Sequence, residues 1–320
     1  MEGRLEKETV FYKSVEQKLA GLPPVINEYY VSLRANRMSY TSIKVYINNV
    51  LHFVNYINKK ENSFYKDVTI TDIERYFISL ETKNNGQRMG DDALQQRWSA
   101  LNNFFSFLQK RGYISSNPVD AVSRPKNNVE HKVTYLTQEE MGKLFKAIDR
   151  NPSNIMAARD AAVIKLGLST GLRVSALVNI NVGDIDFNNN VIHVIEKRQK
   201  VRSINIGENV KKMLQEWISV RSEAFGDVDT QALFISRKRN RLSTDAVSEL
   251  LEKYCADAGI KRITPHKMRS SAACALAKNG LPVKAIAKQL GHSNTNVTMK
   301  YIDVFEEDEK KTLDVLDGLI

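Results

Sequence analysis

Cysteine is scarce in this sequence of 320 residues, which holds only Cys255 and Cys274. Two cysteines without metal-ligand spacing indicate neither a disulfide scaffold nor a zinc site, so we expect both thiols to be reduced and buried. Long apolar runs are missing as well, because no stretch approaches the ~18 residues that a membrane-spanning helix needs. The N-terminal MEGRLEKETV lacks the apolar core of a secretory signal. We therefore predict a cytoplasmic protein with no membrane partner.

Acidic residues are also in deficit, since 37 Asp and Glu stand against 47 Lys and Arg, for a net charge of +10. Most of the basic excess lies after residue 125. Clustered basic side chains concentrate phosphate and release counterions on contact, so this balance favours a polyanionic partner. A hydrophobic content of 42% at this length indicates about two globular domains.

Residues 1–114 show helical periodicity and predict a bundle of about four helices. The segment SIKVYINNVLHFVNYI places its apolar residues on one face, and either Ser39 or Thr41 is positioned to cap it. A later segment, ALQQRWSALNNFFSFLQKRG, carries an aromatic stripe that includes Trp98 and Phe105. Because its spacing follows the buried face, we expect this stripe to form core and not a platform for stacking bases.

Residues 115–134 mix proline, asparagine and charge without a period, which predicts a linker. A second domain, 135–303, opens with a capping-box pattern at Thr137 and Glu140. Its segment VIHVIEKRQKVRSINI predicts two strands joined by a polar hairpin. We expect a mostly helical domain with a small antiparallel sheet, followed by an acidic tail, 304–320, with apolar residues at helical spacing.

Polar residues gather in four short segments, at points where helices and strands begin or end. Each has an ordinary structural interpretation by itself, as a helix start, a surface ion pair, a solvated hairpin or a core aromatic. Together they supply guanidinium forks, imidazoles, an ammonium group and a phenol, which are the groups that phosphodiester chemistry needs. The residues are Arg173 in STGLRVSAL, Lys197 in EKRQKVRS, His266 and Arg269 in TPHKMRSSA, and His292 and Tyr301 in GHSNTNVTMKY.

The order and spacing of these segments resemble the tyrosine recombinase (integrase) family, most closely its compact Xer-like members, over residues 22–303. The resemblance rests on TGLRVS, a hairpin lysine 24 positions after Arg173, HKMR for the family's His-x-x-Arg box, LGH, and a tyrosine nine residues after His292. It implies a mainly α fold with a small antiparallel β-sheet. An N-terminal four-helix (SAM-like) core-binding domain would precede a mixed α/β catalytic domain.

The resemblance also implies a function, namely site-specific DNA recombination through a 3′-phosphotyrosyl intermediate and a Holliday junction, with no metal or other cofactor. The implied roles are nucleophile for Tyr301, phosphate clamp for Arg173 and Arg269, general acid for Lys197, acid/base for His266, and transition-state hydrogen bond for His292. The implied partners are double-stranded DNA with paired inverted-repeat half-sites and three further copies of the chain, as a homotetramer on two duplexes. In that assembly the tail 304–320 would dock on a neighbouring protomer. An accessory protein or a second recombinase is left open, as is the choice between dimer resolution, integration of a mobile element and inversion.

At Ala176 the sequence departs from the family's pattern, and in the hairpin two lysines are candidates for one role. Ala176 stands where many relatives carry an acidic residue that supports the catalytic side chains, and Asp184 is a candidate substitute. Lys200 competes with Lys197 for the hairpin role, and the family's spacing favours Lys197. Contacts with DNA are predicted at six basic residues on polar helix faces or in turns, which are Lys44, Arg97, Lys200, Arg202, Arg239 and Arg241. Solvated faces explain Lys44, Arg97, Arg239 and Arg241 equally well.

A helix-turn-helix regulator without cleavage is the alternative from another class. The segment VKAIAKQLGHSNTNVTMKYI has the small residues, glycine and second helix of such a motif. That interpretation leaves Arg173, Lys197 and the pair of His266 and Arg269 without a role, so we favour the recombinase.

Overall fold

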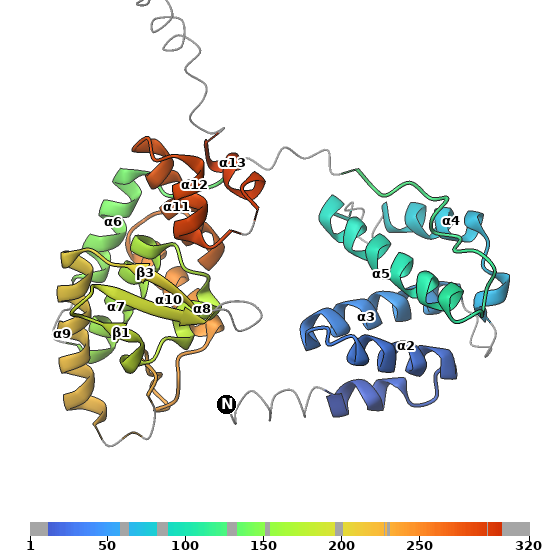
Figure 1. The fold of residues 1–320 in the computed structure, drawn as a ribbon, viewed down its shortest axis with the longest axis horizontal. Helices are drawn as coiled ribbons and strands as arrows, with labels where there is room; N and C mark the ends of the chain where they lie inside the picture. The colour runs from blue at the N-terminus through green and yellow to red at the C-terminus, as the bar shows by residue number, and fades with distance from the viewer. Residues whose placement is uncertain are drawn as a thin grey trace, which may run out of the picture. The chain divides into compact units, whose positions relative to one another are not determined.

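The chain divides into two compact units, Met1–His131 and Lys132–Ile320, which are drawn as ribbons in Figure 1. The computed structural model describes residues 12–57, 64–81, 89–126, 133–150, 154–195, 201–226, 228, 231–292 and 294–302. Lys197, Lys200 and the tail 304–320 lie outside the described residues. Each unit has its own hydrophobic core.

The regular elements of the first unit are all helices in the part of the chain that the structure describes, as the periodicity predicts. Besides helical residues 12–19, its elements are α2 (Pro24–Ala35), α3 (Tyr40–Tyr56), the short 3-10 helix η1 (Phe64–Asp67), α4 (Ile70–Glu81) and α5 (Asp91–Lys110). Of the two residues positioned to cap α3, Ser39 does so, because its hydroxyl accepts a hydrogen bond from the backbone N–H of Ser42. Helices α3 and α5 pack against each other, and both contribute residues to the core.

Aromatic side chains fill this core, which confirms the structural interpretation of the stripe on α5. Phe105 is completely buried, and Phe104 beside it makes an edge-to-face contact with Tyr29 on α2. Trp98 is only partly buried, and its indole N–H donates to the carbonyl of Val122. The stripe therefore stabilises the bundle, and Trp98 also binds the segment after α5 through the carbonyl of Val122.

The second unit combines helices with a three-stranded antiparallel sheet. Its elements are α6 (Gln138–Ile148), α7 (Ile155–Thr170), α8 (Val174–Asn179), η2 (Val182–Asp184), β1 (Ile185–Asp186), β2 (Val191–Ile195), β3 (Val201–Asn205), α9 (Glu208–Phe225), α10 (Thr244–Asp257), α11 (Pro265–Lys278), α12 (Val283–Leu290) and α13 (Asn296–Ile302). The predicted capping box is present, because Thr137 and Glu140 each bond the other's backbone N–H. Strands β2 and β3 form the predicted hairpin, and β1 adds a short third strand antiparallel to β2.

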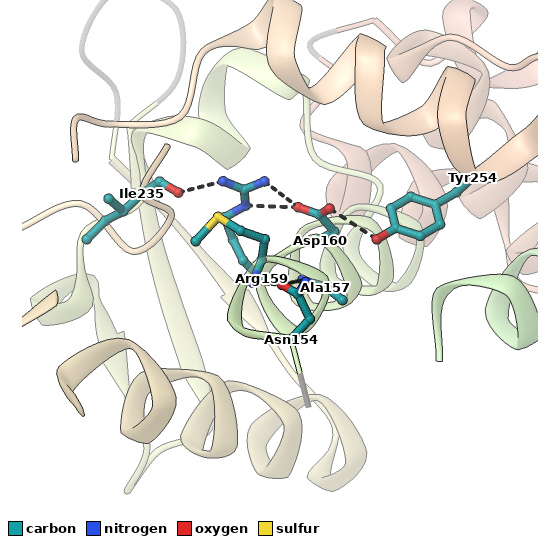
Figure 2. A network of polar contacts seen from close by, with 7 residues as sticks. Asn154, Ala157, Arg159, Asp160, Ile235 and Tyr254 are labelled. Atoms are coloured by element: carbon teal, nitrogen blue, oxygen red, sulfur yellow. Dashed lines mark hydrogen bonds and ion pairs between the residues drawn. The ribbon is translucent and has the colours of Figure 1, made fainter. Parts of the chain in front are cut away.

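Helix α7 is the central element of this unit and packs against α6, α9 and α11. It is buried on several sides, and two adjacent charged residues near its start, Arg159 and Asp160, are buried with it. Figure 2 shows how these charges are satisfied: Arg159 bonds Asp160 and the carbonyl of Ile235, while the Tyr254 hydroxyl donates to the other Asp160 oxygen at 3.1 Å. A buried pair is tolerated only with such partners, so this network ties α7 to α10 and to the Ile235 segment.

Both cysteines are buried, as expected. Among the described residues, no helix is both long and apolar enough to cross a membrane.

Candidate active site

The first side of the site is built where α7 gives way to α8. Gly171 ends α7 with φ +63°, a left-handed conformation that glycine adopts without strain. A Cβ at this position would lie 2.5 Å from Leu290 Cδ2, so the glycine also permits a close approach of α12. Arg173 follows as the N-cap residue of α8, with its side chain exposed. Its Nη2 lies 3.5 Å from the carbonyl oxygen of Gly291.

Arg269 lies between two helix ends. Thr264 caps α11, and Arg269 follows on that helix with only 5% of its surface exposed. Its Nη1 donates to the carbonyl of Gly171 at 3.0 Å, and its Nη2 donates to the carbonyl of Leu290 at 2.7 Å. The C-terminal ends of α7 and α12 carry partial negative charge, which offsets the cost of burying the guanidinium.

His292 is presented by the turn that ends α12. Gly291 takes φ +69°, and the backbone N–H of His292 returns to the carbonyl of Ala287 at 2.9 Å. The ring Nδ1 lies 2.8 Å from the hydroxyl of Thr298 on α13, and Thr298 is completely buried. A ring held through one nitrogen has a defined orientation, with the other nitrogen directed elsewhere.

Tyr301 lies one helical turn beyond Thr298, on the same face of α13. It is 5% exposed and packs in a small cluster with Cys274, Ile286 and Leu290. Its ring stacks on that of His292, with centroids 6.4 Å apart and planes 15° apart. Four of the six predicted catalytic residues thus meet around the C-terminal end of α12; they are Arg173, Arg269, His292 and Tyr301.

His266 stands one turn before Arg269, at the exposed start of α11. Its Nδ1 lies 3.4 Å from the hydroxyl of Ser270, which also contacts the His266 carbonyl. Spacing of three residues puts His266 and Arg269 on the same side of the helix. The hairpin lysines Lys197 and Lys200 fall between β2 and β3, outside the described residues.

The residues predicted to contact DNA divide into two groups in the structure. Lys44 and Arg239 are exposed, and Arg239 sits in a turn with φ +61°. The other three that the structure describes bond within their own unit. Arg97 donates to the Tyr76 hydroxyl, Arg202 to the carbonyls of Lys288 and Gln289, and Arg241 to the carbonyls of Val178 and Ile180 and to Asn181.

Ala176, the position that departs from the family's pattern, is buried in α8. Asp184 accepts from the backbone N–H of Asn181 at 2.7 Å and so caps η2. Burial lowers the pKa of Arg241, and the nearby Asp184 carboxylate partly opposes this shift. Asp184 therefore serves the turn after α8, and its hydrogen bond does not reach the arginines at the end of α12.

Sequence reasoning missed Thr298, the residue that holds the His292 ring. A usable signal exists, because threonine three residues before the tyrosine falls one turn earlier on the same face of the helix. It also missed the intramolecular use of Arg202, which depends on the strand register.

The chain matches known proteins along most of its length. Residues 134–308 match the model of the phage integrase family. The chain is 30% identical over 304 residues to "Tyrosine recombinase XerC" of Caldanaerobacter subterraneus subsp. tengcongensis, which covers 88% of this chain and 83% of that protein.

Two solved structures show a similar fold. The first is the XerH site-specific recombinase bound to palindromic difH substrate, at a TM-score of 0.72 and 21% identity over 88% of this chain and 81% of the other. The second is a lambda integrase tetramer bound to a Holliday junction, at a TM-score of 0.67 and 19% identity over 87% and 76% of the two chains. From the family match and the XerC relative together, the chain belongs to the phage integrase family and is a tyrosine-type site-specific recombinase.

Proposed function

We propose that this recombinase cuts and rejoins DNA through a 3′-phosphotyrosyl intermediate and a Holliday junction, with Tyr301 as the nucleophile. The observation that carries the proposal is the convergence of two arginines, a histidine and a tyrosine at the end of one short helix. A cluster of this kind has the donors to hold a phosphate and the phenol to attack it.

The cleavage step balances without an external energy source. The Tyr301 oxygen forms a bond to the scissile phosphorus as the bond from phosphorus to the 5′-oxygen breaks. The phenolic proton passes to His266, because a protonated phenol is a poor nucleophile and must lose its proton as it attacks. Lys197 donates a proton to the departing 5′-oxygen. Ligation is the reverse reaction, in which a 5′-hydroxyl of the partner strand attacks the phosphotyrosine.

Charge on the phosphoryl oxygens grows as the tyrosine attacks, and the two arginines stabilise it. A Thr298 hydroxyl that donates to Nδ1 of His292 leaves the proton of the neutral ring on Nε2. That tautomer makes His292 a hydrogen-bond donor to a phosphoryl oxygen. The buried threonine is then part of the machinery, because it determines which ring nitrogen faces the phosphate.

Tyr301 is almost fully buried in the DNA-free chain. Attack on a DNA phosphate therefore requires α13 to shift, or its ring to leave the stack with His292. Such a requirement keeps the nucleophile from reacting before DNA is in place.

The partners follow from the same proposal. Paired half-sites on double-stranded DNA each take one protomer, and four protomers on two duplexes exchange strands. Support comes from the lambda integrase relative of similar fold, whose tetramer is bound to a Holliday junction. Residues 1–114 would be the core-binding domain, with Lys44 among its DNA contacts, and 135–303 the catalytic domain.

The test is a protein–DNA adduct that survives SDS. Wild type and Tyr301→Phe are mixed with nicked fragments of the source genome, and the DNA that stays attached is sequenced. Adduct from wild type alone supports the proposal and reveals the target site. Binding without adduct in either protein contradicts it and points to a regulator that reads DNA through α12 and α13.

A further inference from the structure

The C-terminal end of α12 has an unusual set of hydrogen-bond partners. The backbone N–H groups of Gly291 and His292 return to Lys288 and Ala287, which closes the helix in a Schellman motif. The last carbonyls of a helix otherwise have no partner within it. Those of Gln289, Leu290 and Gly291 must therefore be satisfied from elsewhere, while the Lys288 carbonyl accepts from Gly291 and has one lone pair left for a second donor.

Three arginines from three different elements supply those partners. Arg173 at the start of α8 reaches the carbonyl of Gly291, and Arg269 on α11 reaches that of Leu290. Arg202 on β3 takes the remaining two, since its Nη1 lies 3.0 Å from the Lys288 oxygen and 2.8 Å from the Gln289 oxygen. The positive guanidinium groups also face the negative end of the helix macrodipole.

The register of the sheet explains why Arg202 points toward α12. In the antiparallel pairing of β2 and β3, Arg202 lies opposite Val194, and Ile204 lies opposite Ile192. Val194, Ile192 and Ile204 are buried, so Arg202 belongs to the inward face. The exposed pair His193 and Ser203 occupies the other face. An inward arginine on a strand needs polar partners, and the end of α12 provides them.

We propose that Arg202 is a positioning residue for the phosphate clamp, holding the end of α12 so that His292 and the partners of Arg173 and Arg269 keep their places. This inference rests on the proposed function. Without Arg202 the carbonyls of Lys288 and Gln289 lose a charged donor, and the turn that carries His292 loosens. Leu290 and Gly291, which anchor the two clamp arginines, lie within that same turn.

The predicted DNA contact of Arg202 is the competing interpretation. A phosphate contact contributes to DNA affinity and to its salt dependence, with little effect on the rate of cleavage once DNA is bound. A positioning residue does the opposite, because it acts through groups that stabilise the transition state. Affinity and the single-turnover rate therefore separate the two.

The experiment compares Arg202→Met, which keeps length without donors, with Arg202→Lys and with Lys212→Met as the matched control. Lys212 is an exposed lysine on α9, away from the site. Synthetic duplexes carry the site recovered with the adduct assay, with either a phosphate or a methylphosphonate at the cleaved position. A methylphosphonate lacks one charged oxygen, so the clamp contributes less to its cleavage.

Arg202→Met should slow single-turnover cleavage of the phosphate by about 10- to 100-fold, the usual effect of removing an outer-shell partner. The cleavage rate of Arg202→Met should fall by a smaller factor, relative to wild type, on the methylphosphonate. Its DNA affinity should stay within about 3-fold of wild type. Arg202→Lys should recover part of the rate, because it restores the charge without the planar fork. Lys212→Met should match wild type on both duplexes.

Three outcomes overturn the inference: weaker DNA binding with an unchanged cleavage rate, equal losses on both duplexes, or wild-type behaviour of Arg202→Met. Amide hydrogen exchange of the DNA-free protein gives a readout that needs no target site. The amides of Gly291 and His292 should exchange faster in Arg202→Met than in Lys212→Met, and equal exchange contradicts the inference. Failure of wild type to form any adduct instead contradicts the proposed function.

Discussion

Gly171 offers a direct test of how the site is assembled, through the substitution Gly171→Ala. The residue combines φ +63° with a carbonyl that accepts from Arg269. An added Cβ would lie 2.5 Å from Leu290 Cδ2 and 3.2 Å from Ala272 Cβ. The methyl group therefore strains the backbone and pushes on the end of α12 at the same time.

The expected cost follows from three contributions. A left-handed conformation costs an L-residue roughly 1–2 kcal/mol. Leu290 is fully buried, so its displacement resembles the overpacking of a core, at roughly 1–3 kcal/mol. Alanine restricts the unfolded chain more than glycine does, which offsets about 0.4–1 kcal/mol of this destabilisation. We expect Gly171→Ala to lower the free energy of unfolding of the second unit by roughly 1–5 kcal/mol.

Urea unfolding followed by tryptophan fluorescence measures the free energy of unfolding of the second unit alone. Trp98 lies in the first unit and Trp217 in the core of the second, so Trp98→Phe is introduced as the common background. Gly142→Ala is the matched control, because Gly142 lies within α6 with open space around its Cβ position. The free energy of unfolding of Gly142→Ala should exceed that of the background protein by about 0.5–1 kcal/mol. Equal stability of Gly171→Ala and the background protein would refute the close approach of α12.

Three further predictions concern single side chains. Thr298→Val removes the hydroxyl beside His292 at nearly constant shape, so it should slow adduct formation by about 10-fold without changing DNA affinity, while Thr298→Ser keeps most of the rate. Burial raises the pKa of the Cys274 thiol to about 11, so the native protein at pH 8 should resist iodoacetamide and the urea-unfolded protein should react. Asp160→Asn leaves the Arg159 charge buried without its counter-charge and should cost about 3–5 kcal/mol of unfolding free energy, against less than about 1 kcal/mol for Asp149→Asn in the exposed pair with Lys165.

Local sequence signals predict the helix starts well, because a cap acts within one turn. The capping box predicted at Thr137 and Glu140 is present. The choice between Ser39 and Thr41 could not be made from the sequence, since both can accept the required bond and only the backbone decides between them. The short strand β1 was not predicted, because two residues carry no period.

Spacing and order singled out the residues that gather at the end of α12, although they come from three separate helices and the turn after α12. Their separations along the chain are those of the family, so the resemblance supplied what local pattern cannot. The basic residues of the DNA-contact prediction show the limit of such reasoning. Charge alone does not distinguish Lys44, which is exposed, from Arg97, which donates to the buried hydroxyl of Tyr76.

The case of Arg202 shows what kind of information was missing. In the sequence it closes a run of basic residues, and a run of that kind is typical of a solvated hairpin. One residue of shift along the strand would exchange the faces of β3 and turn Arg202 outward. The inward direction is decided by the pairing of Val194 with Arg202, and the available partner is decided by where α12 ends. The strand pairing and the position of the end of α12 both depend on the tertiary structure, so neither can be read from the local sequence. A basic residue in a strand next to a nucleic-acid site therefore needs its register before it is assigned to DNA, and here the register assigns it to the helix that carries His292.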